Sequence, residues 1–408
     1  MMAGGFALKG QCLEPWADYH QYSSLCYNDI QPLSIAREVD ERTFPYVNGG
    51  LQGGELVGGA VEYPVLTGLF MWVTGAFATS PDEYLVVNVL LLAPFGLLTA
   101  WLLGKMAGVR ALLFAAAPAL ALYAFHNWDL LAVAAATSGF YLWWRGHPVW
   151  AAVAFGVGAA LKMYPILFVG PVALEALMQR APRRAAAIAG TAGLTFLVIN
   201  LPFAIAGFDG WLATYEFHTL RGPNFDNIWA VRDFGPIHLP FLEPARLNLV
   251  TALLTAVLFV TALTFGWWRG KNVDRYPVVA VSAALLAAFL LFNKVHSPQY
   301  ALWIMPFFVL LRVPLAWWAG YTAVDLAVYI GVFRFFHQSC ATNNCQLFED
   351  PTGWQQLMTA GVFLRAFMLM ALFAMFLLSR ETPDPGSKLK TTRVPSHPPA
   401  RVVSVGDA

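Results

Sequence analysis

Charged residues are scarce in this sequence. Only 12% of its 408 residues are charged while 58% are hydrophobic, and a soluble domain of ordinary composition has about a quarter charged residues. This composition argues against a water-soluble fold. The formal net charge is +1 and the basic residues are dispersed, so nucleic acid is not an expected partner.

Motifs for metals and nucleotides are also lacking. The segments assigned below to the outer face contain no HxxH, CxxC or DxD spacing, and the chain has no P-loop or Rossmann glycine pattern. Those spacings bring ligands together on one helix or loop. We therefore expect no metal and no cofactor.

Long apolar runs predict an all-α polytopic membrane protein with about eleven transmembrane helices. A spanning helix needs roughly 17–25 apolar residues. Runs of that kind cover residues 84–104, 109–126, 128–145, 184–206, 246–268, 276–292, 315–336 and 357–379. Shorter candidates cover 148–162, 164–178 and 299–312. Residues 64–78 are apolar but too short to span comfortably, so we interpret them as an interfacial or re-entrant helix.

The basic residues fall in every second loop, and this alternation assigns sides. Basic flanks stay in the cytoplasm, so the remaining loops face outward. The cytoplasmic group is Lys105, Arg110, Arg145, Arg180, Arg183, Arg184, Arg269, Lys271, Arg275, Arg312 and the tail from Arg380. The sequence thus predicts a multi-pass plasma-membrane protein with a cytoplasmic carboxyl terminus.

Three regions follow from this topology. Residues 1–83 form a first extracytoplasmic loop with its helix at 64–78, and residues 84–379 form the transmembrane domain with outward loops at 207–245 and 337–356. Residues 380–408 are rich in Pro, Ser and Thr and predict a disordered cytoplasmic tail. An outward first loop needs a preceding hydrophobic segment to cross the membrane, so we expect a further first helix upstream of Ala3–Leu8.

All four cysteines lie in outward segments. Cys12 and Cys26 are in the first loop, and Cys340 and Cys345 are in a later one. Because disulfides persist in oxidising compartments, two local pairs are expected. Four unrelated thiols are the alternative.

Two carboxylates of the first loop are candidates for chemistry. Asp29 has apolar neighbours and no basic residue beside it, so it can serve as a general base, or it can be the N-cap of a helix at 32–40. Glu62, followed by Tyr63, stands before the 64–78 helix, where it either supports substrate binding or complements the helix dipole.

Two further motifs place charge at membrane depth. Asp129 follows a tight helix connection and needs a hydrated cavity or a cation such as Lys162 or Lys294. Lys162 precedes Tyr164 at a helix break. Two interpretations of Lys162 are open: it has a functional role, as an ionisable group at membrane depth often does, or its side chain extends to the outer surface.

The remaining candidate site residues lie in a short polar segment between two apolar runs and in one long loop. Lys294, His296, Gln299 and Tyr300 lie between two apolar runs and offer a cation, an imidazole and an amide suited to a phosphate. The loop 207–245 interleaves aromatics with polar side chains, which suits sugar rings or lipid head groups. Its supporting candidates are Arg221, Asp226, Asn227 and Arg232.

The ordered motifs resemble those of a known family. Tyr-Asn-Asp-Ile at 27–30, Glu-Tyr-Pro at 62–64, Asn-Trp-Asp at 127–129, Lys-Met-Tyr-Pro at 162–165, Asp-Asn-Ile-Trp at 226–229 and Ser-Pro-Gln-Tyr-Ala-Leu-Trp at 297–303 are similar to glycosyltransferase family 87. This family belongs to the GT-C superfamily and includes actinobacterial polyprenyl-phosphate-mannose-dependent mannosyltransferases. The resemblance runs from about residue 9 to residue 379.

The resemblance implies an integral membrane glycosyltransferase with its catalytic carboxylate in the first outward loop, at Asp29. It implies inverting, metal-independent transfer of a sugar, expected to be mannose, from a polyprenyl-phosphate donor to a hydroxyl of a glycolipid or glycan acceptor. The donor phosphate is expected near Lys162, Lys294, His296 and Tyr164. A lipid-linked sugar flippase or transporter, and a scaffold of a cell-envelope complex, are the alternatives. A transporter of this kind typically has internal repeats, and none is evident.

Overall fold

The computed structural model describes residues 1–14, 16–230, 242–273, 275–346 and 352–382. Its regular structure is almost entirely helical, as the sequence predicted, and the chain is an all-α polytopic membrane protein. The bundle consists of α5 (Pro81–Ala107), α6 (Leu112–Ala115), α7 (Pro118–Tyr123), α8 (Asp129–Trp144), α9 (Pro148–Leu161), α10 (Val169–Met178), α11 (Pro182–Ala206), α13 (Pro244–Val273), α14 (Val278–Phe292), α15 (Ala301–Leu310), α16 (Leu315–Asn343) and α17 (Gly353–Leu378).

Five helices in the described part of the chain are long and apolar enough to cross a membrane. They are α5 with its continuation to Ala115, α11, α13, α16 and α17. The shorter apolar helices α9, α10, α14 and α15 coincide with four other predicted spans. Short 3₁₀ turns precede two of them, η4 (Tyr164–Phe168) and η6 (Pro298–Tyr300), and each carries a proline in its first turn.

One predicted span is interrupted. Residues 109–126 form η3 (Gly108–Ala111), α6 and α7 rather than one helix. Ala117 is extended, with ψ at 135°, because the ring of Pro118 disfavours the helical conformation of the residue before it. The break turns the chain toward His126, and this turn matters for the site.

The first loop is built from short elements. They are α1 (Met2–Lys9), η1 (Gly10–Leu13), η2 (Ala17–Tyr19), α2 (His20–Ser23), α3 (Ile30–Ala36), β1 (Gly50–Gln52), β2 (Glu55–Val57) and α4 (Val65–Gly75). The strands β1 and β2 pair antiparallel, with Leu51 opposite Leu56. Helix α4 is the short apolar helix predicted at 64–78, and its Thr67 hydroxyl donates to the Leu161 carbonyl at the end of α9.

The core and the periphery of the bundle differ in burial. Every residue of α15 is buried, and most of α14 is buried as well. In contrast, α11 and α13 expose large apolar side chains such as Leu197 and Val257. Exposed leucine and valine along whole helices suit contact with lipid rather than water.

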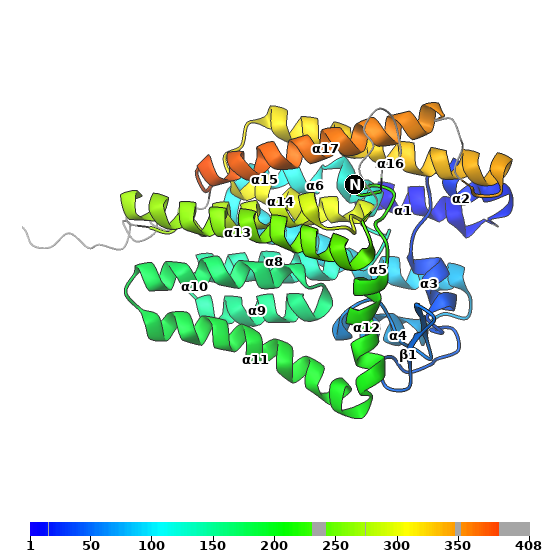
Figure 1. Ribbon diagram of the computed structural model, residues 1–408, viewed down its shortest axis with the longest axis horizontal. Coiled ribbons are helices and arrows are strands. Elements are labelled where there is room, and N and C mark those ends of the chain that lie inside the picture. The colour runs from blue at the N-terminus through cyan, green and yellow to red at the C-terminus, as the bar shows by residue number, and fades with distance from the viewer. Residues whose placement is uncertain (15, 231–241, 274, 347–351, 383–408) are drawn as a thin grey trace, which may run out of the picture.

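Figure 1 shows that the long helices run side by side and that the first-loop elements gather at one end of them. Helix α12 (Phe208–Leu220) lies at this same end and runs across the bundle. The turn that joins α10 to α11 lies at the opposite end, with Arg180 in the turn and Arg183 at the start of α11. Elements far apart in sequence are thus brought together where the polar motifs are.

Two glycines let α12 pack directly on the first loop. A Cβ atom at Gly207 would come within 2.1 Å of the Val47 carbonyl oxygen, and one at Gly210 within 2.4 Å of the Tyr46 carbonyl oxygen. Only glycine permits such close contact of backbone with backbone. Helix α12 is therefore held against the loop that carries Asp29 and Glu62.

Candidate active site

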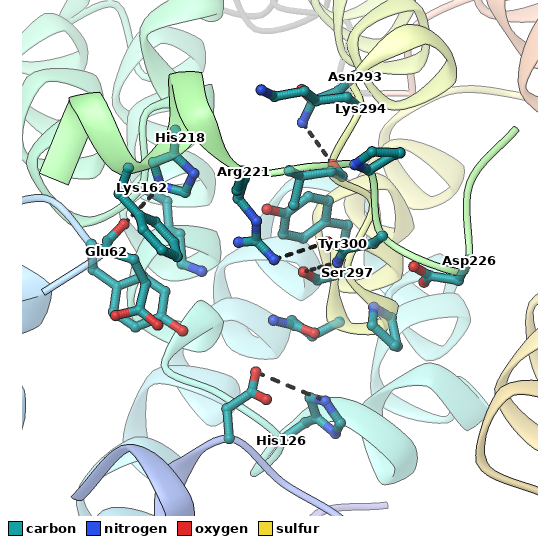
Figure 2. A pocket seen from close by; sticks show the side chains of 18 of the residues that line it. Glu62, His126, Lys162, His218, Arg221, Asp226, Asn293, Lys294, Ser297 and Tyr300 are labelled. Atoms are coloured by element: carbon teal, nitrogen blue, oxygen red, sulfur yellow. Dashed lines mark hydrogen bonds and ion pairs between the residues drawn. The ribbon is translucent and has the colours of Figure 1, made fainter. Parts of the chain in front are cut away.

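A cavity of about 890 Å³ opens between the first loop, α12 and the ends of the bundle helices. Most of the residues singled out from the sequence line it. They are Asp29, Glu62, Tyr63, Lys162, Tyr164, Arg221, Asp226, Lys294, Gln299 and Tyr300. Figure 2 shows Glu62, Lys162 and His218 together on one side of the cavity, with Arg221, Ser297 and Tyr300 beside them.

Asp29 stands at the N-cap position of α3, yet its side chain makes no capping hydrogen bond. The neighbouring Asn28 caps instead, because its Oδ1 accepts from the Gln31 backbone N–H at 3.0 Å. The Asp29 carboxylate is 24% exposed and faces the cavity. Of the two interpretations of Asp29, the geometry does not support the capping role.

Two residues of the connection between α7 and α8 hold the Asp29 carboxylate. The Asn127 side chain donates to Oδ2 of Asp29 at 2.8 Å, and Nε2 of His126 lies 4.0 Å from the same oxygen. The Asp29 backbone N–H also donates to the His126 carbonyl at 2.7 Å. Burial raises the pKa of Asp29, whereas the Asn127 hydrogen bond and the charge of Lys162 act to lower it.

Lys162 is enclosed by aromatic rings and one carboxylate. Its Nζ lies 3.4 Å from Oδ2 of Asp129, 4.4 Å from the centre of the Tyr63 ring and 5.9 Å from that of Tyr300. Asp129 is fully buried and also accepts from the Trp303 indole N–H at 2.7 Å. The lysine is thus the cation that Asp129 was expected to need, and the rings hold it at a fixed place on the cavity wall.

The aromatic wall continues through stacked rings. Trp303 lies between Tyr164 and Tyr300, with ring centroids 4.2 Å and 3.8 Å away. Such stacking restricts the side chains of all three residues. Tyr164 therefore belongs to a rigid wall beside Lys162.

Glu62 has a partner that the sequence did not reveal. Arg37 donates to it in a bidentate pair, Nε to Oε2 at 2.6 Å and Nη2 to Oε1 at 3.3 Å. The ring Nε2 of His218 lies 2.8 Å from the Glu62 carbonyl oxygen, and burial lowers the pKa of this histidine. Glu62 is therefore engaged by Arg37, and both side chains line the cavity.

Two cations lie on the side of the cavity formed by α12 and the 293–297 connection. The guanidinium of Arg221 donates to Oδ1 of Asn224 at 2.9 Å, and Nζ of Lys294 donates to the Thr219 carbonyl at 3.1 Å. Asn227 is buried behind this wall, and its amide donates to the Lys294 carbonyl. It supports the segment that carries Lys294 rather than facing the cavity.

Asp226 links the cavity to a buried arginine. Arg365 of α17 lies 3.7 Å from Asp226 and 3.7 Å from Asp325 of α16, and it also donates to the Asp226 backbone carbonyl. Burial raises the pKa of Asp226 to about 6, while the charge of Arg365 acts in the opposite direction. One cation is thus shared by two buried carboxylates.

Three of the predicted site residues are not on the cavity wall. His296 is 2% exposed, with Nδ1 3.1 Å from the Leu290 carbonyl, so it lies behind the surface where a phosphate was expected. Asp129 lies beneath Lys162, and Asn227 lies behind Lys294. Arg232 lies outside the described residues.

Both expected disulfides are present. Cys12 is joined to Cys26 and Cys340 to Cys345. The first bridge ties the end of η1 to the segment that leads into Asp29. Within the described ranges, no group of three or more His, Cys, Asp or Glu side chains is arranged to hold a metal ion.

The helical fold and the cavity together define a polytopic membrane protein with a polar, charged site among apolar helices. Residues 62–293, more than half of the chain, match the profile of glycosyltransferase family 87, and the chain belongs to this family. It is therefore a membrane glycosyltransferase, which moves a sugar from a donor to an acceptor. No curated protein matches the chain. The matched stretch contains Lys162 and Arg221 but begins after Asp29.

Proposed function

We propose that this glycosyltransferase moves mannose from a polyprenyl-phosphate donor to a hydroxyl of a glycolipid or glycan acceptor, with inversion at the anomeric carbon. Asp29 is the general base. The donor class and the sugar come from the resemblance of the ordered motifs to the polyprenyl-phosphate-mannose-dependent members of the family. The reaction takes place on the extracytoplasmic face of the plasma membrane, as the alternation of basic loops predicts.

The observation that carries this proposal is the opposition of charges across one cavity. The Asp29 carboxylate lies on the first-loop side, held by Asn127 at 2.8 Å. Arg221 and Lys294 line the same cavity from α12 and the 293–297 connection. A base on one wall and cations on another are what a single displacement at a sugar phosphate requires.

The charge change of the reaction explains why cations are needed. A lipid monophosphate sugar is a phosphodiester with one negative charge, and the lipid phosphate that leaves becomes a monoester that gains a second. Because this charge develops in the transition state, Arg221 and Lys294 stabilise the transition state more than the bound donor. The charge of Lys162 is already neutralised by Asp129, 3.4 Å away. Lys162 therefore stabilises the leaving phosphate less than Arg221 and Lys294 do, and acts chiefly by placing the donor.

The step itself is a direct displacement. The acceptor oxygen attacks the anomeric carbon while Asp29 takes the hydroxyl proton, and the bond from that carbon to the phosphate oxygen breaks. The new glycosidic bond forms on the face opposite the leaving phosphate, so the configuration inverts. One carboxylate suffices for this chemistry, and it requires neither a metal ion nor a cofactor.

Radiolabelled sugar transfer in proteoliposomes tests the assignment. With polyprenyl-phosphate mannose as donor, Asp29→Asn should reduce transfer by at least about a hundredfold, within the range lost with a general base. Donor binding should remain. Asp40→Asn is the matched control because Asp40 is an exposed carboxylate of the same loop.

The outcomes separate the candidate activities. Near-normal turnover by the Asp29 variant would exclude Asp29 as the base. Movement of the intact lipid-linked sugar across the bilayer without transfer would indicate a flippase. Transfer from a different lipid-linked sugar would correct the mannose assignment alone.

A further inference from the structure

A fully buried lysine lies beneath the first loop and takes no part in the chemistry described so far. Lys9, at the end of α1, is 0% exposed. Its Nζ lies 2.5 Å from the Tyr27 carbonyl oxygen, 3.0 Å from the Tyr329 hydroxyl and 3.2 Å from Nδ1 of His126. A buried ammonium is costly unless each of its hydrogens finds an acceptor, and these three contacts match its three hydrogens.

The direction of each hydrogen bond can be assigned. The Tyr27 carbonyl only accepts. The Tyr329 hydroxyl donates its single hydrogen to the Leu25 carbonyl at 2.6 Å, so it accepts from Lys9. The third ammonium hydrogen then points at Nδ1 of His126, which accepts it only if this nitrogen carries no proton.

The tautomer of His126 follows from this assignment. Burial keeps the pKa of His126 well below its ordinary value, so the ring is neutral and carries one proton. With Nδ1 unprotonated, that proton is on Nε2, the nitrogen 4.0 Å from Oδ2 of Asp29. The distance is longer than a hydrogen bond, so the N–H stabilises the carboxylate through its dipole.

We propose that Lys9 is a positioning residue for the general base: its ammonium fixes the His126 tautomer that turns an N–H toward Asp29. This inference rests on the role of Asp29 proposed above. Asn127 donates to the same Oδ2 at 2.8 Å. Both donors therefore face the same oxygen of Asp29.

A covalent bridge holds the parts of this arrangement together. Cys12 follows Lys9 by three residues, and Cys26 precedes Asp29 by three residues. Their disulfide joins the segment that carries the lysine to the segment that carries the base. The bridge thus fixes the position of Lys9 relative to the Tyr27 carbonyl and Asp29.

The contacts also define the alternative tautomer of His126. Without a charged Lys9, the Tyr27 carbonyl beside the ring becomes an acceptor for a proton on Nδ1, and Nε2 then turns a lone pair toward the Asp29 carboxylate. The pKa of Lys9 is lowered to about 7 by burial, opposed by the charge of Asp29. The two states of Lys9 are therefore both accessible near neutral pH.

Few other titratable groups surround this lysine. Tyr329 comes from α16, and Tyr123 of α7 packs against it with ring centroids 5.5 Å apart. Tyr123 donates in turn to Asp325 at 2.8 Å. Helix α5 also packs against α1, and in the described part of the chain it contributes no charged contact to Lys9. Asp29 and His126 are thus the groups most directly coupled to Lys9.

The tautomer can be measured in the unmodified protein. In lipid nanodiscs with ¹⁵N-labelled histidine, the ring nitrogen shifts distinguish a proton on Nε2 from one on Nδ1, and loss of signals in His126→Gln assigns them. We expect the proton on Nε2 at pH 5.5 and a change toward Nδ1 as the pH rises through about 7. A His126 protonated on Nδ1 at pH 5.5 would overturn the proposal, and this measurement requires no transferase activity.

Kinetics supply the second test. In Lys9→Met, kcat should fall about tenfold, the equivalent of one hydrogen bond, with KM for the donor unchanged and the basic limb of the pH–rate profile lost. Lys105→Met is the matched control because Lys105 is exposed at the end of α5, and its profile should keep both limbs. A Lys9→Met profile of wild-type shape would overturn the proposal. If the wild-type protein shows the expected tautomer and its pH dependence but transfers no sugar, the control of His126 by Lys9 stands and the proposed function is refuted.

Discussion

Replacing Asn127 by leucine should raise the pH at which the enzyme becomes active. The Asn127 amide is 1% exposed, and it donates both to Oδ2 of Asp29 at 2.8 Å and to the Tyr63 hydroxyl at 2.7 Å. A hydrogen bond to the charged form of a carboxyl lowers its pKa. Its loss leaves the effect of burial, which raises the pKa of Asp29, with less opposition.

The size of the effect follows from the hydrogen bond that is lost. A hydrogen bond to a charged group is worth about 1.5–3 kcal/mol, and one pKa unit corresponds to about 1.4 kcal/mol. Leucine has nearly the shape of asparagine and offers no donor. The pKa of Asp29 should therefore rise by about 1–2 units. Because a general base works only when unprotonated, the acidic limb of the kcat/KM profile should move upward by the same amount.

The assay is kcat/KM for sugar transfer in proteoliposomes between pH 4 and 9. Asn200→Leu is the control, since Asn200 is a buried amide of α11 that bonds to the Phe196 carbonyl and Trp211. Its acidic limb should stay in place. The Asn127 variant also leaves the Trp128 backbone N–H without its acceptor, which lowers the melting temperature but does not move a pH limb. An active Asn127→Leu enzyme with an unshifted acidic limb would refute the assignment of that limb to Asp29.

Three other outcomes are expected. Arg365→Met should destabilise the protein by about 3–5 kcal/mol, because it leaves the buried carboxylates Asp226 and Asp325 without their cation. The melting temperature in detergent measures this loss. Arg145→Met is the control, since Arg145 is exposed and its replacement should change the melting temperature little. Arg221→Gln should lower kcat for transfer from the lipid-phosphate donor about ten- to a hundredfold, the loss of one charge-assisted hydrogen bond to the developing phosphate charge, and an unchanged kcat would remove this residue from the phosphate site. Replacing Cys12 and Cys26 by alanine should cost about 3 kcal/mol for a loop of this length, measured as a lower melting temperature, whereas an equal melting temperature would contradict the stabilising role of the bridge.

The sequence predicted the class of fold because its strongest signal is local. Runs of apolar residues marked the helices, and the location of all four cysteines in outward segments suggested both disulfides. The break before Pro118 could not be predicted from hydropathy. The apolar run at 109–126 is continuous in hydropathy, but the chain breaks at Ala117, because a proline changes the backbone without changing the apolar character.

The partners within the site could not be predicted in the same way. Asp29 and Lys162 stood out because an ionisable residue beside an apolar helix is rare. Arg37, which pairs with Glu62, lies 25 residues away from it, and Lys9 lies 117 residues from His126. Neither pair has a local signal, since only the folding of the loop onto the bundle brings the partners together. The unexpected burial of Lys9 left no trace in composition or periodicity.

The glycines of α12 have a consequence for the placement of Arg221. Because Gly207 and Gly210 meet the main chain of Val47 and Tyr46 with no side chain between, the position of α12 on the first loop is set by peptide backbone. A single added methyl at either glycine would collide with a carbonyl oxygen. It would push α12, together with Arg221 at its carboxyl end, away from the loop.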